Sequence, residues 1–339
     1  MIPAEYYSLV YILIVIIVAI PVLNGYYNKP HIQFQPIDQG SQKGALIFTI
    51  FMILFVGFRP NSPIFADGPG YWGAMIDHRW EYVDWHEFYN QFAFVELMSF
   101  MSSHNTEPRV CFLVLAAVNF GFSYVALRKL FPNDTLLAMV MFFGTFGTFA
   151  FAVNGIKNGC AFAMFLCAFA YKDNWKLCFL FIILSLGFHH SMQLSVGAFL
   201  VATFYKKQNT YFALWIICLL IAAAHITFFQ NFLAGYTDEH GAGYLITDGN
   251  RGDGGYYAGF RLDFILYSSV PVALSYWISV KKKVISEDYL VYGNTYILMN
   301  SIWMLCMYAE FTNRIAYLSW FMYPLVLIYP CYAIANEKH

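Results

Sequence analysis

A set of polar and charged residues stands at the ends of long apolar segments rather than within polar loops. The set is Arg59, Asp67, Asn154, Lys157, His189, His190, Arg261, Asp263, Glu310 and Arg314. Ionisable groups at membrane depth are costly unless they line a cavity or pair with one another, so the set suggests a site. For any single arginine, an equally good interpretation is that its side chain extends to lipid headgroups.

Asp67 is the first candidate for acid–base chemistry. It lies in the stretch FADGPGYW, residues 65–72, where the neighbouring Gly68 and Pro69 predict a turn that directs the carboxylate away from any helix. A carboxylate held in this way could act as a general base toward a sugar hydroxyl. The alternative is that Asp67 only caps the turn.

Asn154, Lys157 and Asn158 would share one face if the chain is helical there. An ammonium and two carboxamides at the start of a helix form a suitable seat for a phosphate, because the helix dipole adds to their charge. The alternative for Lys157 is contact with lipid headgroups.

His189 and His190 separate two apolar segments and are followed by Ser191. Adjacent histidines point apart, and no cysteine or acidic residue stands at ligand spacing, so we expect no metal site. His189 could donate a hydrogen bond to a phosphate or carry a proton for a reacting hydroxyl. The alternative is a polar hinge.

Two later segments add further candidates. The loop 234–261 is rich in glycine and tyrosine and contains Arg251, so it could close as a mobile lid over a glycan, although tyrosines also populate membrane interfaces. Glu310 and Arg314 are four residues apart and could form an ion pair, while Arg314 could also bind an anionic diphosphate.

The composition indicates which elements must position these residues. Hydrophobic residues make up 60% of the chain and charged residues only 12%, about half the charged fraction of a soluble domain. The net charge of −1 gives no reason to expect a nucleic-acid partner. Apolar runs recur along the whole length and predict an all-α, polytopic transmembrane helix bundle of about eleven spans. The expected spans are 6–23, 43–58, 109–127, 134–153, 157–171, 175–188, 191–205, 211–233, 262–280, 289–308 and 315–334.

The short connections between these spans are alternately basic, with lysine or arginine at 29 and 43, 128 and 129, 172 and 176, 206 and 207, 281–283, and 338. The positive-inside rule therefore places the N-terminus outside and the C-terminus in the cytoplasm. The polar set then lies on the outer side. The outer loop 59–107 contains an apolar stretch, 92–101, that is too short to cross and suits a re-entrant or surface helix. We expect residues 1–339 to form a single integral membrane domain.

Several motifs resemble the EpsG-type, Wzy-like membrane proteins of bacterial exopolysaccharide, capsule and O-antigen synthesis. They are GFR at 57–59 with Asp67 and Tyr71, KNGCA at 157–161, YKDN at 171–174, FHHS at 188–191, and the arginines Arg261 and Arg314. One departure is Lys157-Asn158, where the family pattern has arginine followed by glutamine. Lysine keeps the charge but lacks the two-pronged guanidinium.

The resemblance implies a GT-C-like glycosyltransferase of the bacterial inner membrane with an outward-facing cavity. It would polymerise oligosaccharide repeat units carried on undecaprenyl diphosphate in the outer leaflet, with inversion at the anomeric carbon and with no metal or other cofactor. Asp67 or His189 would take the proton of the acceptor hydroxyl. A chain-length regulator is a further expected partner, besides the bilayer itself. The residues expected to bind substrate are Arg59, Tyr71, Asn154, Lys157, His190, Arg251, Arg261, Glu310 and Arg314.

Two other classes of protein stay open. A flippase or transporter of lipid-linked glycans would also need a basic cavity, but the sequence has no internal repeat and no polar residues that continue to the inner face. A membrane acyltransferase that modifies glycans would need a histidine near a cytoplasmic or mid-membrane thioester path.

Overall fold

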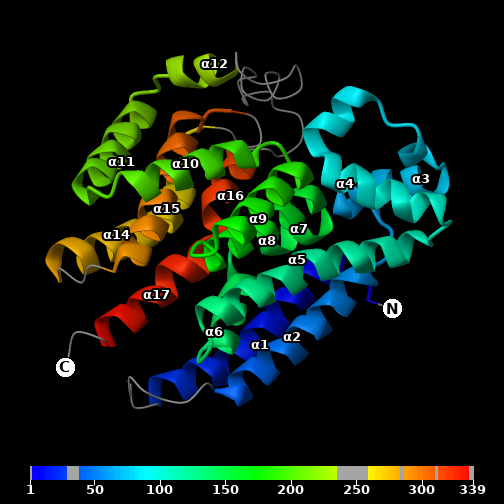
Figure 1. The fold of residues 1–339 in the computed structure, drawn as a ribbon, viewed down its shortest axis with the longest axis horizontal. Helices are drawn as coiled ribbons and strands as arrows, with labels where there is room; N and C mark the ends of the chain where they lie inside the picture. Colours follow the sequence, from blue (N-terminus) through cyan, green and yellow to red (C-terminus); the bar gives the residue numbers. More distant parts are fainter. Residues whose placement is uncertain (1, 29–37, 235–258, 283–285, 310–311, 336–339) are drawn as a thin grey trace. The chain divides into compact units, whose positions relative to one another are not determined.

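The computed structural model describes residues 2–28, 38–234, 259–282, 286–309 and 312–335, which are helical with short connections and contain no β-strand. The expected all-α class is therefore confirmed for these residues. They divide into two compact units, Met1–Gln193 and Leu194–His339 (Figure 1).

The first unit consists of nine longer helices and three short 3₁₀ turns, as far as the described residues extend. They are η1 (Ala4–Tyr6), α1 (Tyr7–Asn28), α2 (Gln39–Gly57), η2 (Pro63–Phe65), α3 (Gly68–Ile76), η3 (Arg79–Glu81), α4 (Trp85–Ser103), α5 (Pro108–Leu130), α6 (Thr135–Gly144), α7 (Thr148–Val153), α8 (Ile156–Ala170) and α9 (Trp175–Phe188).

Helix α5 packs against α2 on one side and α8 on the other, and α8 in turn packs against α9 (Figure 1). Glycines allow the close approaches. A Cβ atom on Gly57 would lie 2.8 Å from the backbone of Leu113, and one on Gly159 would lie 2.5 Å from the Asn119 side chain. Because any larger residue would collide at these points, the two glycines fix how closely α2 and α8 approach α5.

Three of the expected spans, 134–153, 211–233 and 315–334, are each divided between two helices in the structure. The segment 134–153 forms α6 and α7, and Gly147 between them has a φ of 99°, a value that favours glycine. Its apolar composition predicts burial correctly but not this break, because hydropathy does not report backbone direction.

The second unit contains α10 (Met192–Phe204, apart from its first two residues), α11 (Gln208–Ala223), α12 (Phe228–Ala234), α14 (Leu262–Tyr276), η4 (Trp277–Lys281), α15 (Glu287–Leu305), α16 (Thr312–Trp320) and α17 (Tyr323–Ala335). Helix α15 contacts α11, α14, α16 and α17. Inside the unit, Trp215 donates to Asn300 at 2.9 Å, and Asn300 donates to Ser319 at 3.2 Å. These bonds join α11, α15 and α16 through buried polar groups.

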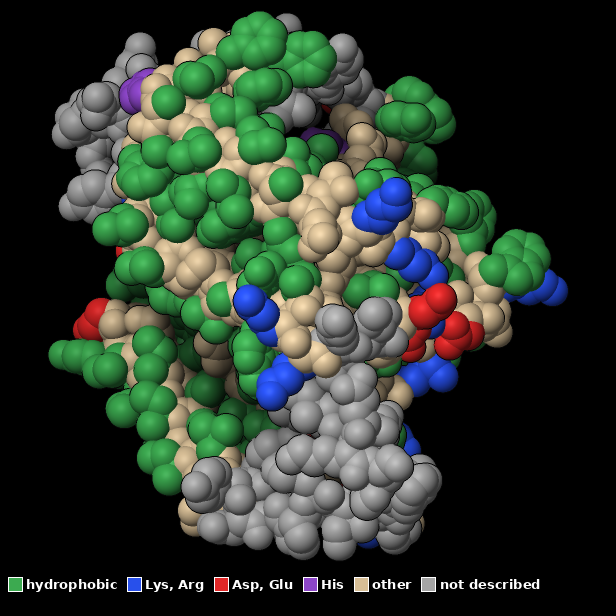
Figure 2. All heavy atoms as spheres, turned by 90° about the vertical axis from the view of Figure 1, so that its left-hand side faces the viewer, with side chains coloured by type: hydrophobic (Ala, Val, Ile, Leu, Met, Phe, Trp, Pro, Cys, Tyr) green, Lys and Arg blue, Asp and Glu red, His purple; other side chains and the backbone are tan. Residues whose placement is uncertain are grey.

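The outer surface of the described chain is strongly apolar. Ile17 and Ile20 of α1 are 67% and 64% exposed, and Leu266 of α14 is 60% exposed. Figure 2 shows one face on which hydrophobic side chains predominate. Such exposure is unfavourable in water and normal in lipid, where only the backbone polar groups must be satisfied internally.

Four described helices are long and apolar enough to cross a membrane, and they cover Ala4–Gly25, Gln39–Gly57, Pro108–Leu130 and Leu262–Lys281. Shorter apolar helices of 10–17 residues accompany them, including α6, α8, α9, α10 and α11. Together these helices fit a multi-pass membrane protein. The count of about eleven spans stays a prediction.

Candidate functional site

Arg59 lies two residues beyond the end of α2, in the first unit, and its side chain is only 4% exposed. Its Nη1 donates to the carbonyl oxygen of Val56 at 3.0 Å and its Nη2 to that of Val153 at 3.4 Å. The guanidinium carbon stands 4.2 Å above the ring of Phe112. Arg59 therefore ties the end of α2 to the end of α7 and faces the start of α5.

Burial lowers the pKa of the Arg59 guanidinium to about 10, because the charged form is poorly solvated there. The group is still protonated at neutral pH. Since both terminal nitrogens bind backbone carbonyls, the positive charge would act on a nearby anion mainly through the protein interior, where screening by water is weak.

Asp67 is exposed and stands directly before α3, but its side chain does not cap that helix. Its backbone N–H instead donates to Oδ1 of Asn154 at 3.2 Å. The next residue, Gly68, is buried, and a Cβ there would lie 3.6 Å from the carbonyl oxygen of Val153 and 4.0 Å from Nη2 of Arg59. The turn expected at Asp67 is thus the entry to α3, and it brings the Asp67 backbone close to Arg59.

Asn154 and Lys157 do not share a helix face. Asn154 lies at the break between α7 and α8, with φ −117° and ψ −76°, whereas Lys157 is in the first turn of α8. The Cβ of any larger residue at Gly155 would lie 2.5 Å from the Phe151 ring, so the break needs a glycine. The break allows Asn154 to accept from Asp67 while Lys157 points elsewhere.

Lys157 is held by groups from the segment 59–107. Its Nζ donates to Oε1 of Gln91, on α4, at 2.6 Å. The ammonium also lies 5.9 Å from the ring centre of Tyr71 and 5.4 Å from that of Phe94, within the range of cation–π attraction. The Tyr71 ring stacks on Trp80 at 6.3 Å. Tyr71 and Lys157 therefore lie close together. Gln91 was not a candidate in the sequence, because a lone glutamine has no motif.

His189 ends α9, and His190 follows it with its ring parallel at a centroid distance of 5.0 Å. The backbone N–H of Ser191 donates to Nδ1 of His189 at 3.2 Å. Nδ1 is therefore an acceptor, and the proton of the neutral ring is on Nε2. Ser185 donates to the carbonyl of Ala161 at 2.8 Å, so the antiparallel helices α8 and α9 place the two histidines at the same end as Lys157.

The same end of the first unit holds buried polar atoms with no hydrogen-bond partner among the described residues. Among them are Oδ1 of Asn158 and Oγ of Ser191. Buried polar groups are nearly always satisfied, so such atoms indicate contact with water or with a polar ligand. In the described chain, no group of three or more histidine, cysteine, aspartate or glutamate residues could hold a metal ion. The expected absence of a metal stays a prediction.

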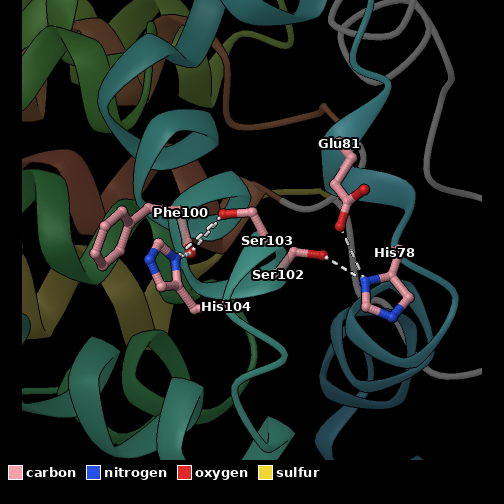
Figure 3. A network of polar contacts seen from close by, with 6 residues as sticks. All are labelled: His78, Glu81, Phe100, Ser102, Ser103 and His104. Atoms are coloured by element: carbon pink, nitrogen blue, oxygen red, sulfur yellow. Dashed lines mark hydrogen bonds and ion pairs between the residues drawn. The ribbon is translucent and has the colours of Figure 1, made fainter.

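A network of polar contacts within residues 78–104 fixes the elements that carry Tyr71 and Trp80. Nδ1 of His78 lies 3.0 Å from Oε1 of Glu81 and 3.4 Å from Oγ of Ser102, at the end of α4. Figure 3 shows Ser102 and Glu81 both directed at His78, and His104 lying over Phe100. The contacts join the turn after α3 to α4. None of these residues was a candidate in the sequence, because their spacing follows no known pattern.

The remaining candidates belong to the second unit or lie outside the described residues. Arg261 binds Asp263 at 2.6 Å and stands 3.8 Å from the centre of the Phe264 ring, and Arg314 is half-buried on α16. Arg251 and Glu310 lie outside the described residues, and with them most of the glycine- and tyrosine-rich loop and the expected pair of Glu310 with Arg314. A shared anion site for Arg59, Arg261 and Arg314 stays a prediction.

Neither a curated protein nor a solved structure matches the chain. A family model does match it, over residues 44–339, which is most of the sequence and includes every candidate residue discussed above. The chain therefore belongs to the EpsG family.

Proposed function

We propose that this protein is a polysaccharide polymerase that joins oligosaccharide repeat units carried on undecaprenyl diphosphate. Membership of the EpsG family supports a polymerase of this type. The observation that favours a catalytic role for the first unit is the meeting of one exposed carboxylate, Asp67, with Arg59 and Asn154 around the break between α7 and α8.

The proposed reaction is glycosyl transfer with inversion. A hydroxyl oxygen of the acceptor forms a bond to the anomeric carbon of the donor while the bond from that carbon to the lipid diphosphate breaks. The electron pair leaves with the diphosphate, and the hydroxyl proton passes to a base. Cationic side chains that stabilise the departing diphosphate would lower the barrier, since they act where negative charge develops. A diphosphate is already a good leaving group.

Asp67 is the better candidate for the base, and His189 for a hydrogen-bond donor. Nδ1 of His189 already accepts the Ser191 N–H, so the neutral ring presents Nε2–H, which donates. The exposed carboxylate of Asp67 can accept a proton directly. His189 would then bind a phosphate or sugar oxygen.

We further propose about eleven spans with the N-terminus outside and the C-terminus in the cytoplasm, so that the site opens to the outer leaflet in a GT-C-like arrangement. The alternation of basic connections supports this orientation. In this orientation α8 begins at the outer side, where Lys157 would meet a lipid-linked substrate.

Polymer length tests the proposal. In cells that lack the endogenous protein, Asp67→Asn should abolish long-chain product, with a loss of about 10²- to 10⁴-fold for removal of a general base. His189→Gln should reduce product less, because glutamine can still donate. Asp77→Asn is the matched control, since Asp77 is exposed in the same outer segment and pairs only at the surface with Arg79.

Expression of each variant is measured alongside, and wild-type membranes are assayed with a chelator. Long chains from Asp67→Asn would rule out Asp67 as the base. Loss of wild-type activity in the presence of the chelator would indicate that the reaction requires a metal ion. A product that is modified but no longer than a single repeat unit would indicate an acyltransferase.

A further inference from the structure

Large aromatic side chains are exposed at the start of α4, in the first unit. Tyr82, Trp85 and Tyr89 are 88%, 76% and 74% exposed. Trp85 and Tyr89 are four residues apart on the helix, so their side chains share one face. One side of the Trp85 ring stacks on Phe88 at 5.6 Å, and its other side is open. Exposed aromatic rings gathered on one short stretch of chain mark a surface that binds a partner.

The charge of this segment argues against contact with a membrane. Between Arg79 and Arg109 the chain contains five acidic residues and no lysine or arginine. Glu81 and Asp84, beside the aromatic side chains, are exposed. Helices that lie on a bilayer usually carry lysine and arginine on their polar face, because these residues are attracted to anionic lipids. Carboxylates within the hydrocarbon are costly. A water-exposed partner without negative charge therefore fits this surface better than lipid does.

The exposed rings continue a line of aromatic residues that leads to Lys157. The ring of Trp80, two residues before Tyr82, is buried and lies 6.3 Å from Tyr71 and 5.4 Å from Phe94. The rings of Tyr71 and Phe94 lie within 6 Å of the Lys157 ammonium. A partner on the exposed rings would therefore extend toward the candidate site in the same unit.

Polar contacts fix the turn that carries Tyr82. His78 lies 3.0 Å from Glu81 and 3.4 Å from Ser102, so the turn is joined to the far end of α4 (Figure 3). A binding surface that is already in place loses less conformational entropy when it binds. The backbone that presents the exposed rings is thus arranged before a partner arrives.

We propose that Tyr82, Trp85 and Tyr89 form a stacking surface for uncharged sugars of the growing polysaccharide. This inference rests on the proposed function. The C–H faces of a sugar ring are apolar and pack against aromatic rings, while its hydroxyl groups stay in water. Four residues of helix advance about 6 Å, close to the length of one sugar ring, so Trp85 and Tyr89 suit successive sugars. A chain held here stays near the candidate site between one transfer and the next.

The length of the polysaccharide tests this surface. In cells that lack the endogenous protein, Trp85→Ala and Tyr89→Ala should each shorten the chains by about 5- to 10-fold. Loss of one well-placed aromatic contact speeds release by about that factor, and mean length follows the ratio of extension to release. Trp85→Phe keeps a stacking ring and should retain most of the length. Trp175→Ala is the matched control, since Trp175 is 72% exposed at the start of α9, and it should give wild-type lengths.

Binding and lipid contact are measured on the full-length protein in lipid nanodiscs. Polysaccharide purified from wild-type cells should bind Trp85→Ala about tenfold more weakly than wild type, while the melting temperature stays the same because the ring is exposed. Nanodiscs of brominated phosphatidylcholine quench tryptophans that touch acyl chains. They should remove the same amount of fluorescence from the wild type and from Trp85→Phe. A larger loss from the wild type would place Trp85 in the bilayer and overturn the proposal.

The outcomes distinguish the two levels of inference. Wild-type protein that makes no polymer contradicts the proposed function itself. Wild-type protein that makes polymer, together with chains of equal length from a variant that combines Trp85→Ala and Tyr89→Ala, overturns the stacking surface alone. A wild-type polysaccharide composed mainly of acidic sugars would also overturn it, since the carboxylates beside the rings would repel such a chain.

Discussion

Replacement of Arg59 tests whether its buried charge serves the fold, the reaction or both. Arg59→Met removes the charge and keeps a long apolar side chain over Phe112. Arg59→Lys keeps the charge, but the single ammonium group can reach only one of the carbonyl oxygens of Val56 and Val153. Both variants leave the candidate base Asp67 in place.

The cost to stability can be worked out from the contacts of Arg59. The 3.0 Å bond to Val56 comes from a charged donor and is worth about 1.5–3 kcal/mol. The 3.4 Å bond to Val153 is long and contributes less. Contact with Phe112 at 4.2 Å, out of water, adds about 1–2 kcal/mol. Arg59→Met should therefore lower the free energy of unfolding by about 3–5 kcal/mol at most, and Arg59→Lys by roughly half of that.

We expect the loss of activity to depend on whether the variant keeps the positive charge, and not on how much stability it loses. If the guanidinium stabilises the departing diphosphate, Arg59→Met should lower the polymerisation rate by about 10²- to 10³-fold, as for loss of one preorganised donor. Arg59→Lys should retain most of the rate. The assay is polymer formed per amount of folded protein, with folding followed by the melting temperature in detergent. Near-wild-type rates from folded Arg59→Met protein would refute the electrostatic role and leave Arg59 as a tie between helices.

Two further predictions concern topology and packing. Asn61→Cys should react with an impermeant thiol reagent in intact cells, and Asn209→Cys should not. Both positions are exposed on the protein, but only the first is expected outside the cell. Labelling of Asn209→Cys would overturn the orientation. Gly159→Ala should destabilise the protein by about 1–3 kcal/mol, because its Cβ would lie 2.5 Å from the Asn119 side chain. The control is Gly121→Ala on α5, where nothing lies within 4 Å of the added Cβ, so the substitution should leave protein stability unchanged or raise it. Equal melting temperatures for the two variants would show that α8 can move away from α5.

Much of the fold follows from hydropathy. The expected segment 175–188 coincides with α9, and 43–58 and 109–127 lie within four residues of the ends of α2 and α5. These segments are long or sharply bounded by polar residues, and burial in lipid or protein requires them to be helical. The family resemblance, carried by short motifs in a fixed order, is confirmed by the match over residues 44–339.

The details of the site were harder to foresee. The sequence carries no sign that Asn154 lies between two helices, because the break depends on how Phe151 packs over Gly155. Nor does it indicate α3, whose first turn contains Pro69, although proline is well tolerated at that position. The contact of Gln91 with Lys157 could not be predicted, because it depends on a backbone interruption and on a partner 66 positions away.

If the chain is the proposed polymerase, the length of α8 affects the competition between water and the acceptor hydroxyl. Its 15 residues extend about 22 Å at 1.5 Å per residue, against roughly 30 Å of hydrocarbon, so it falls short of a full crossing by about 8 Å. Nearly all of its side chains are buried, so neighbouring helices rather than lipid surround it. A recessed end at Lys157 would draw the diphosphate of a bound lipid below the plane of the headgroups. Bulk water would then reach the anomeric carbon less readily than the acceptor hydroxyl does, and chain extension would be favoured over wasteful hydrolysis of the donor.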